Sequence, residues 1–120
     1  MPGKPGSKPR PAFVVSIVKA EDGTDGVTVA YGTSQKADSL FTGEFLISPS
    51  DGESFRLAGL SYPTKFDLAG THTLPYTDQW FRVPPNRRYG ETPKIGVVSG
   101  RLANRIRAAW THLQLSRPKR

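Results

Sequence analysis

The hydrophobic and polar positions in the first third of the chain predict a β-hairpin. Residues 12–19, AFVVSIVK, are almost all apolar or β-branched, which is typical of a strand buried on both faces. Residues 27–33, VTVAYGT, alternate apolar and polar side chains as a half-buried strand does. The intervening AEDGTDG contains two Asp-Gly pairs, and this dipeptide favours tight turns. We therefore expect two antiparallel strands joined by a turn at residues 20–26.

The middle of the chain alternates short apolar segments with turn-forming residues. GEFLIS, at residues 43–48, predicts a third strand, which ends at Pro49 and leads through the turn SPSDGES into FRLAGL. Further short strands are expected in TKFDLAG, HTLPY and DQWFRV. With 12 glycines, 11 prolines and no alternation of strands with helices, the pattern indicates a mainly β protein. For so short a chain we predict a small β-barrel of five to seven strands.

One segment near the C-terminus departs from this β pattern. SGRLANRIRAAWTHL, at residues 99–113, starts with serine, which is a favoured N-cap residue. On a helical wheel its apolar side chains lie within about 80° of one another. This stripe consists of Leu102, Ile106, Ala109, Trp110 and Leu113. We expect a C-terminal α-helix whose stripe faces the core, with Ile106 and Trp110 packed inside it.

A chain of 120 residues suits one domain with a modest core, and its charges are unevenly distributed. We place a single domain at residues 10–115, between a flexible basic segment at 1–9 and a basic tail at 116–120. Residues 11–81 hold four basic and nine acidic side chains, whereas residues 82–107 hold seven basic and one acidic. With a net charge of +7, the basic C-terminal third is suited to a polyanion, although basic ends also serve solubility.

Several classes of protein are excluded by what the sequence lacks. It has no cysteine, so no disulfide or cysteine-ligated metal can form, and this absence suits the cytoplasm. No apolar run reaches the roughly 18 residues that span a bilayer, and no secretory signal is present, so we expect no membrane association. His72 and His112 have no partners at metal-binding spacing. Without a phosphate-binding glycine loop or a G-x-S-x-G motif, we expect no cofactor and no metal.

The candidate chemistry lies where the predicted hairpin brings its two strand ends together. Arg10 stands between two prolines directly before the first strand, and GTSQK, at residues 32–36, ends the second. Antiparallel pairing therefore places Arg10 near Thr33 and Ser34. A guanidinium that faces two hydroxyls can bind a phosphodiester and stabilise an oxyanion. A solvated loop arginine beside an ordinary polar strand end fits the same residues, and the pattern alone leaves both interpretations open.

Four segments together resemble one family of small proteins. They are KPRPAFVVS, VTVAYGTSQK, AGLSYPTKFDL followed by HTLPY, and TPKIGVVSGRLANRIRAAW, and they span roughly residues 8–113. In order and spacing they are similar to the PemK/MazF toxins of type II toxin–antitoxin systems. The resemblance implies a small SH3-like β-barrel with a C-terminal helix. It also implies a cytoplasmic homodimer that cleaves single-stranded RNA without metal and is neutralised by a cognate antitoxin.

The resemblance also assigns roles to individual residues. Arg10 corresponds to the arginine that acts on the scissile phosphate, Thr33 to the hydroxyl residue paired with it, and Ser34 adjoins that residue. The implied reaction is attack by the 2′-hydroxyl of the RNA on the neighbouring phosphate, which leaves a cyclic phosphate end. Contacts to the RNA are expected from five further residues, which are Tyr31, Gln35, Lys36, Tyr62 and Lys65.

The chain differs from the family at its start. Only MPGKPGSKPRP precedes the first strand, where family members begin with a GDIW-like strand, so we expect that strand to be missing. Asp67 lies inside a predicted strand, where a structural role fits as well as a catalytic one. An alternative function is therefore a non-catalytic barrel module that binds RNA or inhibits a protein target such as DNA gyrase.

Overall fold

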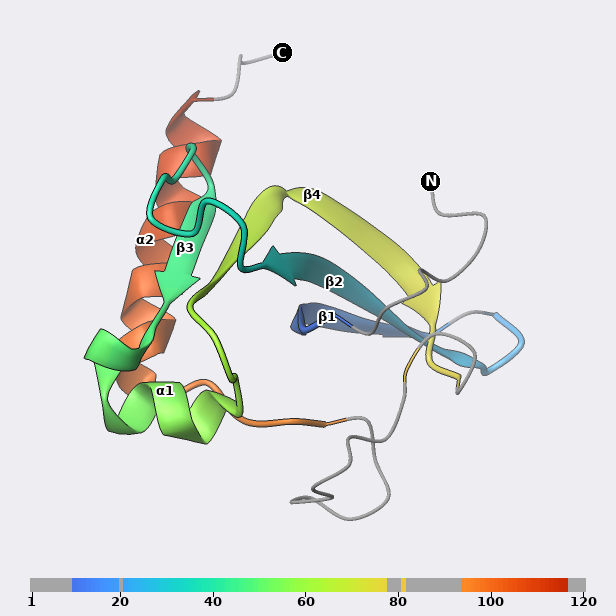
Figure 1. Ribbon diagram of the computed structural model, residues 1–120. Helices are drawn as coiled ribbons and strands as arrows, with labels where there is room; N and C mark the ends of the chain where they lie inside the picture. The colour runs from blue at the N-terminus through green and yellow to red at the C-terminus, as the bar shows by residue number, and fades with distance from the viewer. Residues whose placement is uncertain (1–9, 20, 78–80, 82–93, 117–120) are drawn as a thin grey trace.

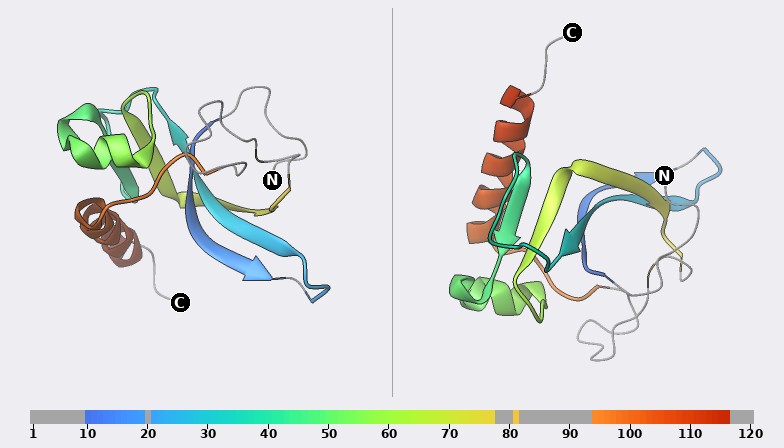
Figure 2. Two further views of the ribbon diagram at one scale, coloured as in Figure 1. Left: turned by 90° about the horizontal axis from the view of Figure 1, so that it is seen from below. Right: turned by 45° about the horizontal axis from the view of Figure 1, so that its top comes forward.

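The computed structural model describes residues 10–19, 21–77, 81 and 94–116 (Figure 1). The described chain forms one four-stranded antiparallel sheet with the strand order β1-β2-β4-β3. Its elements are β1 (Ala12–Lys19), β2 (Asp25–Thr33), β3 (Glu44–Ile47), the 3-10 helix η1 (Pro49–Asp51), α1 (Glu53–Ala58), β4 (Thr64–Pro75) and α2 (Gly100–Ser116). The sheet curls into a half-barrel, and α2 packs along β3 and β4 (Figures 1 and 2). The protein is therefore mainly β with one C-terminal helix, as predicted.

The predicted hairpin is confirmed as β1 and β2. Ala12 pairs with Tyr31 at its open end and Lys19 with Asp25 near the turn. The turn is stabilised by the Asp22 carboxylate, which accepts hydrogen bonds from the backbone N–H and the hydroxyl of Thr24 at 3.0 and 2.7 Å. Short polar side chains that bond to their own backbone in this way favour turns over continued strand.

The prediction that the first strand is buried on both faces is wrong. Among the described residues, β1 stands at the edge of the sheet and has β2 as its one neighbouring strand. Its side chains from Val14 onward are exposed, and Ile17 retains 72% of its accessible surface. A continuous apolar run is typical of central strands, but the sequence does not reveal where a strand lies in the sheet order. The outer face of β1 is consequently an apolar surface that the described residues leave uncovered.

The strand count also differs from the prediction of five to seven. The described residues form four strands, because TKFDLAG and HTLPY belong to the single strand β4. The register of β4 against β2 shifts between Ala30 and Gly32, so residues 67–70 form a bend that lets one strand follow the curl of the sheet. Asp67 supports this bend by accepting a hydrogen bond from the Ala69 N–H at 2.9 Å. The segment DQWFRV lies almost entirely outside the described residues.

The C-terminal helix is confirmed together with its N-cap. The Leu102 N–H donates to the Ser99 hydroxyl at 3.4 Å, and the Ala103 N–H donates to the Ser99 carbonyl at 2.9 Å. The main core lies between α2 and the sheet and consists of Ala30, Phe45, Ile47, Ala58, Phe66, Leu68, Leu102 and Leu113. Ile106 packs against this core. Burial of this apolar stripe holds the helix on the sheet.

The prediction that Trp110 is a core residue is wrong. Its side chain is 42% exposed and lines an open groove with Phe13 and Val15 of β1. The helix lies at the β3 end of the sheet, so its side toward β1 extends beyond the covered core (Figure 2). A helical wheel gives the direction of an apolar stripe but not the width of the surface that covers it.

Residues 48–59 form two short helical segments where the sequence indicated a turn followed by an apolar segment. Asp51 caps η1 by accepting a hydrogen bond from the Ser48 N–H at 2.9 Å. The helix α1 then ends at Gly59, which adopts a left-handed conformation with φ of 75°. At this point the chain meets residues 95–97, and the Val97 N–H donates to the Leu57 carbonyl at 2.8 Å. Gly59 thus ends the helix and permits a close backbone approach.

Replacing Gly59 with alanine is expected to lower the free energy of unfolding by about 2 kcal/mol. A Cβ at this position would lie 1.9 Å from the Ile95 carbonyl oxygen, and its φ is unfavourable for any L-residue with a side chain. Urea unfolding followed by circular dichroism measures the change. Gly100→Ala is the matched control, because a Cβ there meets nothing within 4 Å. Equal stability of the two variants would contradict the close approach.

Candidate functional site

The pairing of β1 with β2 brings Arg10 near Thr33. The Gly32 N–H donates to the Pro11 carbonyl at 2.9 Å, which extends the register of Ala12 with Tyr31 by one residue. Arg10 and Thr33 are the next residues along the chain from this hydrogen bond, so they lie near each other. The Arg10 side chain is exposed and Thr33 is half-buried. The structure therefore brings these two residues together at the open end of the hairpin, where the sequence predicted them.

The segment after Thr33 is a polar turn at the end of β2. The Thr33 hydroxyl accepts a hydrogen bond from the Gln35 N–H at 3.1 Å, and a hydroxyl can also donate its proton. Ser34, Gln35 and Lys36 are exposed, and Lys36 has a left-handed backbone with φ of 51°. A hydroxyl fixed by its own backbone, with further polar groups beside it, is suited to hydrogen bonding with an anion.

Lys65 does not have the surface position that an RNA contact requires. It pairs with Thr33 in the sheet, but its side chain is only 8% exposed. Its ammonium donates to the Ser39 carbonyl at 2.9 Å and to the Glu44 carboxylate at 3.2 Å. The predicted role of Lys65 is therefore corrected: the side chain ties the loop between β2 and β3 to the sheet. No local sequence pattern indicates this pair, since 21 residues separate its members.

The two predicted tyrosines lie in different settings. Tyr31 is half-buried on β2, on the same sheet face as Thr33, because alternate residues of a strand share a face. Its ring centre lies 5.3 Å from that of His72 on β4. Tyr62 is exposed in the segment before β4, where its carbonyl accepts a hydrogen bond from the Thr64 hydroxyl at 2.8 Å. The structure therefore brings Tyr31 close to Thr33, and no described contact joins Tyr62 to either residue.

His72 is a candidate that sequence reasoning missed. The sequence indicates an isolated surface histidine, but in β4 it pairs with Val29 of β2 and its ring lies beside that of Tyr31. It thereby shares a sheet face with Thr33. An imidazole carries two ring nitrogens that can take part in hydrogen bonds with a bound ligand. Only the pairing of β2 with β4 reveals this neighbourhood, and no short motif encodes it.

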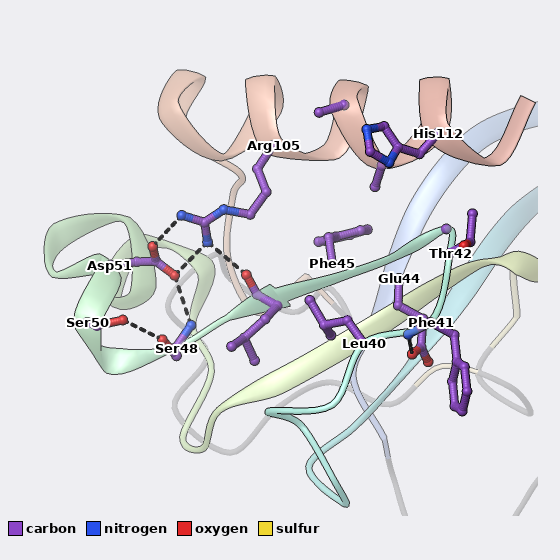
Figure 3. A pocket seen from close by; sticks show the side chains of 14 residues that line it. Leu40, Phe41, Thr42, Glu44, Phe45, Ser48, Ser50, Asp51, Arg105 and His112 are labelled. Atoms are coloured by element: carbon purple, nitrogen blue, oxygen red, sulfur yellow. Dashed lines mark hydrogen bonds and ion pairs between the residues drawn. The ribbon is translucent and has the colours of Figure 1, made fainter. Parts of the chain in front are cut away.

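Away from these residues, a concave region lies between α2, β3 and the loop at residues 40–43, with a volume of about 430 Å³ (Figure 3). Arg105 extends from α2 and donates two hydrogen bonds to the Asp51 carboxylate, at 2.7 and 2.9 Å, and one to the Leu46 carbonyl at 2.8 Å. The hydrogen bonds from Arg105 lower the pKa of Asp51, and the same contact raises the pKa of Arg105. Since the two charges satisfy each other, this region serves to hold α2 on β3.

The described residues offer no metal centre and no transmembrane helix. Among them, no three His, Asp or Glu side chains lie close enough together to hold a metal ion. Within the same residues, no helix is long and apolar enough to cross a membrane. Comparison with protein-family models, curated proteins and solved structures found no match for this chain. The function must therefore be argued from the site itself.

Proposed function

We propose that the protein is an endoribonuclease that cleaves single-stranded RNA without a metal. The observation that supports this proposal is the pairing of β1 with β2, which brings the exposed Arg10, just before β1, near the end of β2 at Thr33. A permanently charged donor opposite a neutral hydroxyl donor matches the oxygens of a phosphodiester. The resemblance to the PemK/MazF family assigns these same two residues to the scissile phosphate.

In the proposed reaction the 2′-oxygen of the RNA attacks the adjacent phosphorus. The bond from the 2′-oxygen to phosphorus forms and the bond from phosphorus to the 5′-oxygen breaks. The products are a 2′,3′-cyclic phosphate and a 5′-hydroxyl, and the 5′-oxygen gains one proton while the 2′-hydroxyl loses one. Arg10 neutralises the charge that develops on the non-bridging oxygens, and Thr33 and Ser34 donate hydrogen bonds to them. One well-aimed donor of this kind contributes about 3 kcal/mol.

The charge of the chain fits an RNA substrate. Residues 82–107 carry seven basic and one acidic side chain, and lysine and arginine contacts to phosphate supply most of the non-specific affinity for nucleic acids. Gln35 and Lys36 are exposed beside Thr33, where a bound strand would pass. On the same family resemblance we infer an SH3-like barrel, a homodimer, a cognate antitoxin and a cytoplasmic location.

Incubation of the purified protein with a long single-stranded RNA in EDTA tests the proposal. Discrete cuts at a limited set of positions are the expected result, because bases splayed on the sheet and loops would select the sites. RNA that stays intact but shifts on a gel, with a steep salt dependence, would replace the nuclease with an RNA-binding module.

A protein-binding module is the second candidate, and a groove between β1 and α2 favours it. The groove has a volume of about 310 Å³ and is lined by Phe13, Val15, Ile106, Arg107 and Trp110, among others. Exposed tryptophan and arginine side chains are the types that dominate protein interfaces. Because β1 and α2 contain no acidic residue, the groove fits an acidic polypeptide segment that carries apolar side chains. Trp110→Ala would then abolish binding to the target protein and leave any RNA cleavage unchanged.

A further inference from the structure

The loop between β2 and β3 holds an aromatic ring in solvent. Phe41 is 77% exposed, although its backbone is fixed. Its N–H donates to the Glu44 carboxylate at 2.6 Å, and the Glu44 N–H donates back to the Phe41 carbonyl at 2.9 Å. Figure 3 shows the ring extending away from α2. The ring is therefore ordered by its own turn without being packed into the core.

A nearly buried ion pair lies beneath this loop. The Lys65 ammonium is 5.6 Å from the centre of the Phe41 ring and bonds to both Ser39 and Glu44. Removal of two charges from water is unfavourable, and their attraction offsets this cost only when the geometry is good. Here the pair stabilises a loop whose two large apolar residues, Leu40 and Phe41, remain exposed. The ion pair therefore adds little buried apolar surface to the core, but it holds the Phe41 ring in one position.

Lys65 connects the ring to the candidate phosphate site. Lys65 pairs directly with Thr33 across β2 and β4, so both side chains project from the same face of the sheet. Thr33 precedes the loop and Phe41 lies near its other end, above the ammonium of Lys65. Lys65 therefore links Thr33, its partner in the sheet, to Phe41, whose ring lies by its ammonium.

We propose that Phe41 is a stacking platform for a nucleobase of single-stranded RNA, close to the phosphate that Arg10 and Thr33 bind. The inference rests on the function proposed above and adds a subsite to it. Aromatic side chains bind unpaired bases by stacking, and one face of every base is available for this contact. Loss of one such contact typically weakens binding about 10-fold.

Binding of an uncleavable RNA separates this subsite from catalysis. A fluorescent 2′-O-methyl RNA lacks the attacking hydroxyl, so anisotropy measures its affinity alone. We expect Phe41→Ala and Phe41→Leu to raise the Kd about 10-fold, and Phe41→Tyr to stay within about twofold of the native chain. Leu40→Ala is the matched control, since Leu40 is the exposed neighbour on the same loop. Thermal melts of all variants should coincide, because an exposed ring adds little to stability.

Each contrary outcome has its own meaning. Native-like binding by Phe41→Leu would show a general apolar contact and overturn the stacking platform. Native binding by every Phe41 variant would remove the subsite and leave the proposed nuclease standing. Failure of the native chain to bind any RNA would overturn both proposals together.

Photocrosslinking locates the base directly. An RNA that carries 5-iodouridine at successive positions should crosslink to Phe41 at one or two of them, as identified by mass spectrometry of the peptides. Crosslinks confined to Tyr31 or Tyr62 would place the base elsewhere and overturn the assignment to Phe41.

Discussion

Replacing Arg10 with alanine is expected to lower the rate of RNA cleavage at least about 100-fold. Arg10 is an exposed charged donor at the hairpin end that carries Thr33, and removal of one well-aimed donor typically costs a factor of 100 to 1000. The change should appear in the rate under saturating RNA more than in the affinity, because the charge that Arg10 neutralises develops in the transition state. Initial rates with a fluorogenic RNA oligonucleotide in EDTA measure it.

Two further variants identify the cause of this loss. Arg10→Lys keeps the charge but not the planar fork, so it should recover only part of the rate. Arg101→Ala removes an exposed arginine from α2, outside the hairpin, and should cleave at the native rate. If Arg10→Ala cleaves as fast as the native chain, the site described here does not carry the reaction. An equal loss in Arg101→Ala would indicate general electrostatic attraction in place of catalysis.

Replacing Asp51 with alanine is expected to lower the free energy of unfolding by about 2 kcal/mol, because Asp51 is buried while Arg105 stays partly hydrated. Asp51 is buried and accepts two hydrogen bonds from Arg105, which also donates to Leu46 on the edge strand β3. Its removal leaves the guanidinium without its carboxylate and removes the acceptor of the Ser48 N–H. Urea denaturation measures the loss. Arg105→Met in the same chain should restore part of it, because no unpaired charge then remains.

The same pair makes stability depend on pH. The hydrogen bonds from Arg105 hold the pKa of Asp51 below its ordinary value of 3.8 in the folded protein. The contribution of the ionised Asp51 to the free energy of unfolding is therefore complete above pH 3.8, and it is lost as the pH falls through the lower pKa of the folded state. Urea unfolding between pH 2 and 6 should show a steeper loss for the native chain than for Asp51→Asn, which cannot titrate at this position. If the free energy of unfolding falls equally with pH in both proteins, the ion pair is not the source of the pH dependence.

The hairpin and the C-terminal helix could be predicted because their sequence signals lie within a few neighbouring residues. The hairpin followed from apolar alternation and Asp-Gly turns, and the helix from Ser99 and its apolar stripe. The placement of Arg10 near Thr33 followed from the hairpin alone, since antiparallel pairing fixes which strand ends meet.

Features that depend on long-range pairing could not be predicted. The exposure of Ile17 and Trp110 depends on the order β1-β2-β4-β3 and on the end of the sheet that α2 covers. In the sequence Lys65 is typical of a surface lysine, but the structure pairs it with Glu44 of β3. His72 is isolated in the sequence, but β4 places it beside Tyr31. Burial, ion pairing and ring contacts are set by tertiary structure and leave no periodic trace in the chain.

The chemical ends of the RNA products test the central proposal most directly. An RNA oligonucleotide is incubated with the protein in EDTA, and the fragments are identified by mass spectrometry. We predict a 2′,3′-cyclic phosphate on the upstream fragment, a 5′-hydroxyl on the downstream fragment, and no cut when the nucleotide at that position is 2′-deoxy. A 3′-hydroxyl with a 5′-phosphate, or a cut that persists at the 2′-deoxy position, would contradict attack by the RNA's own hydroxyl.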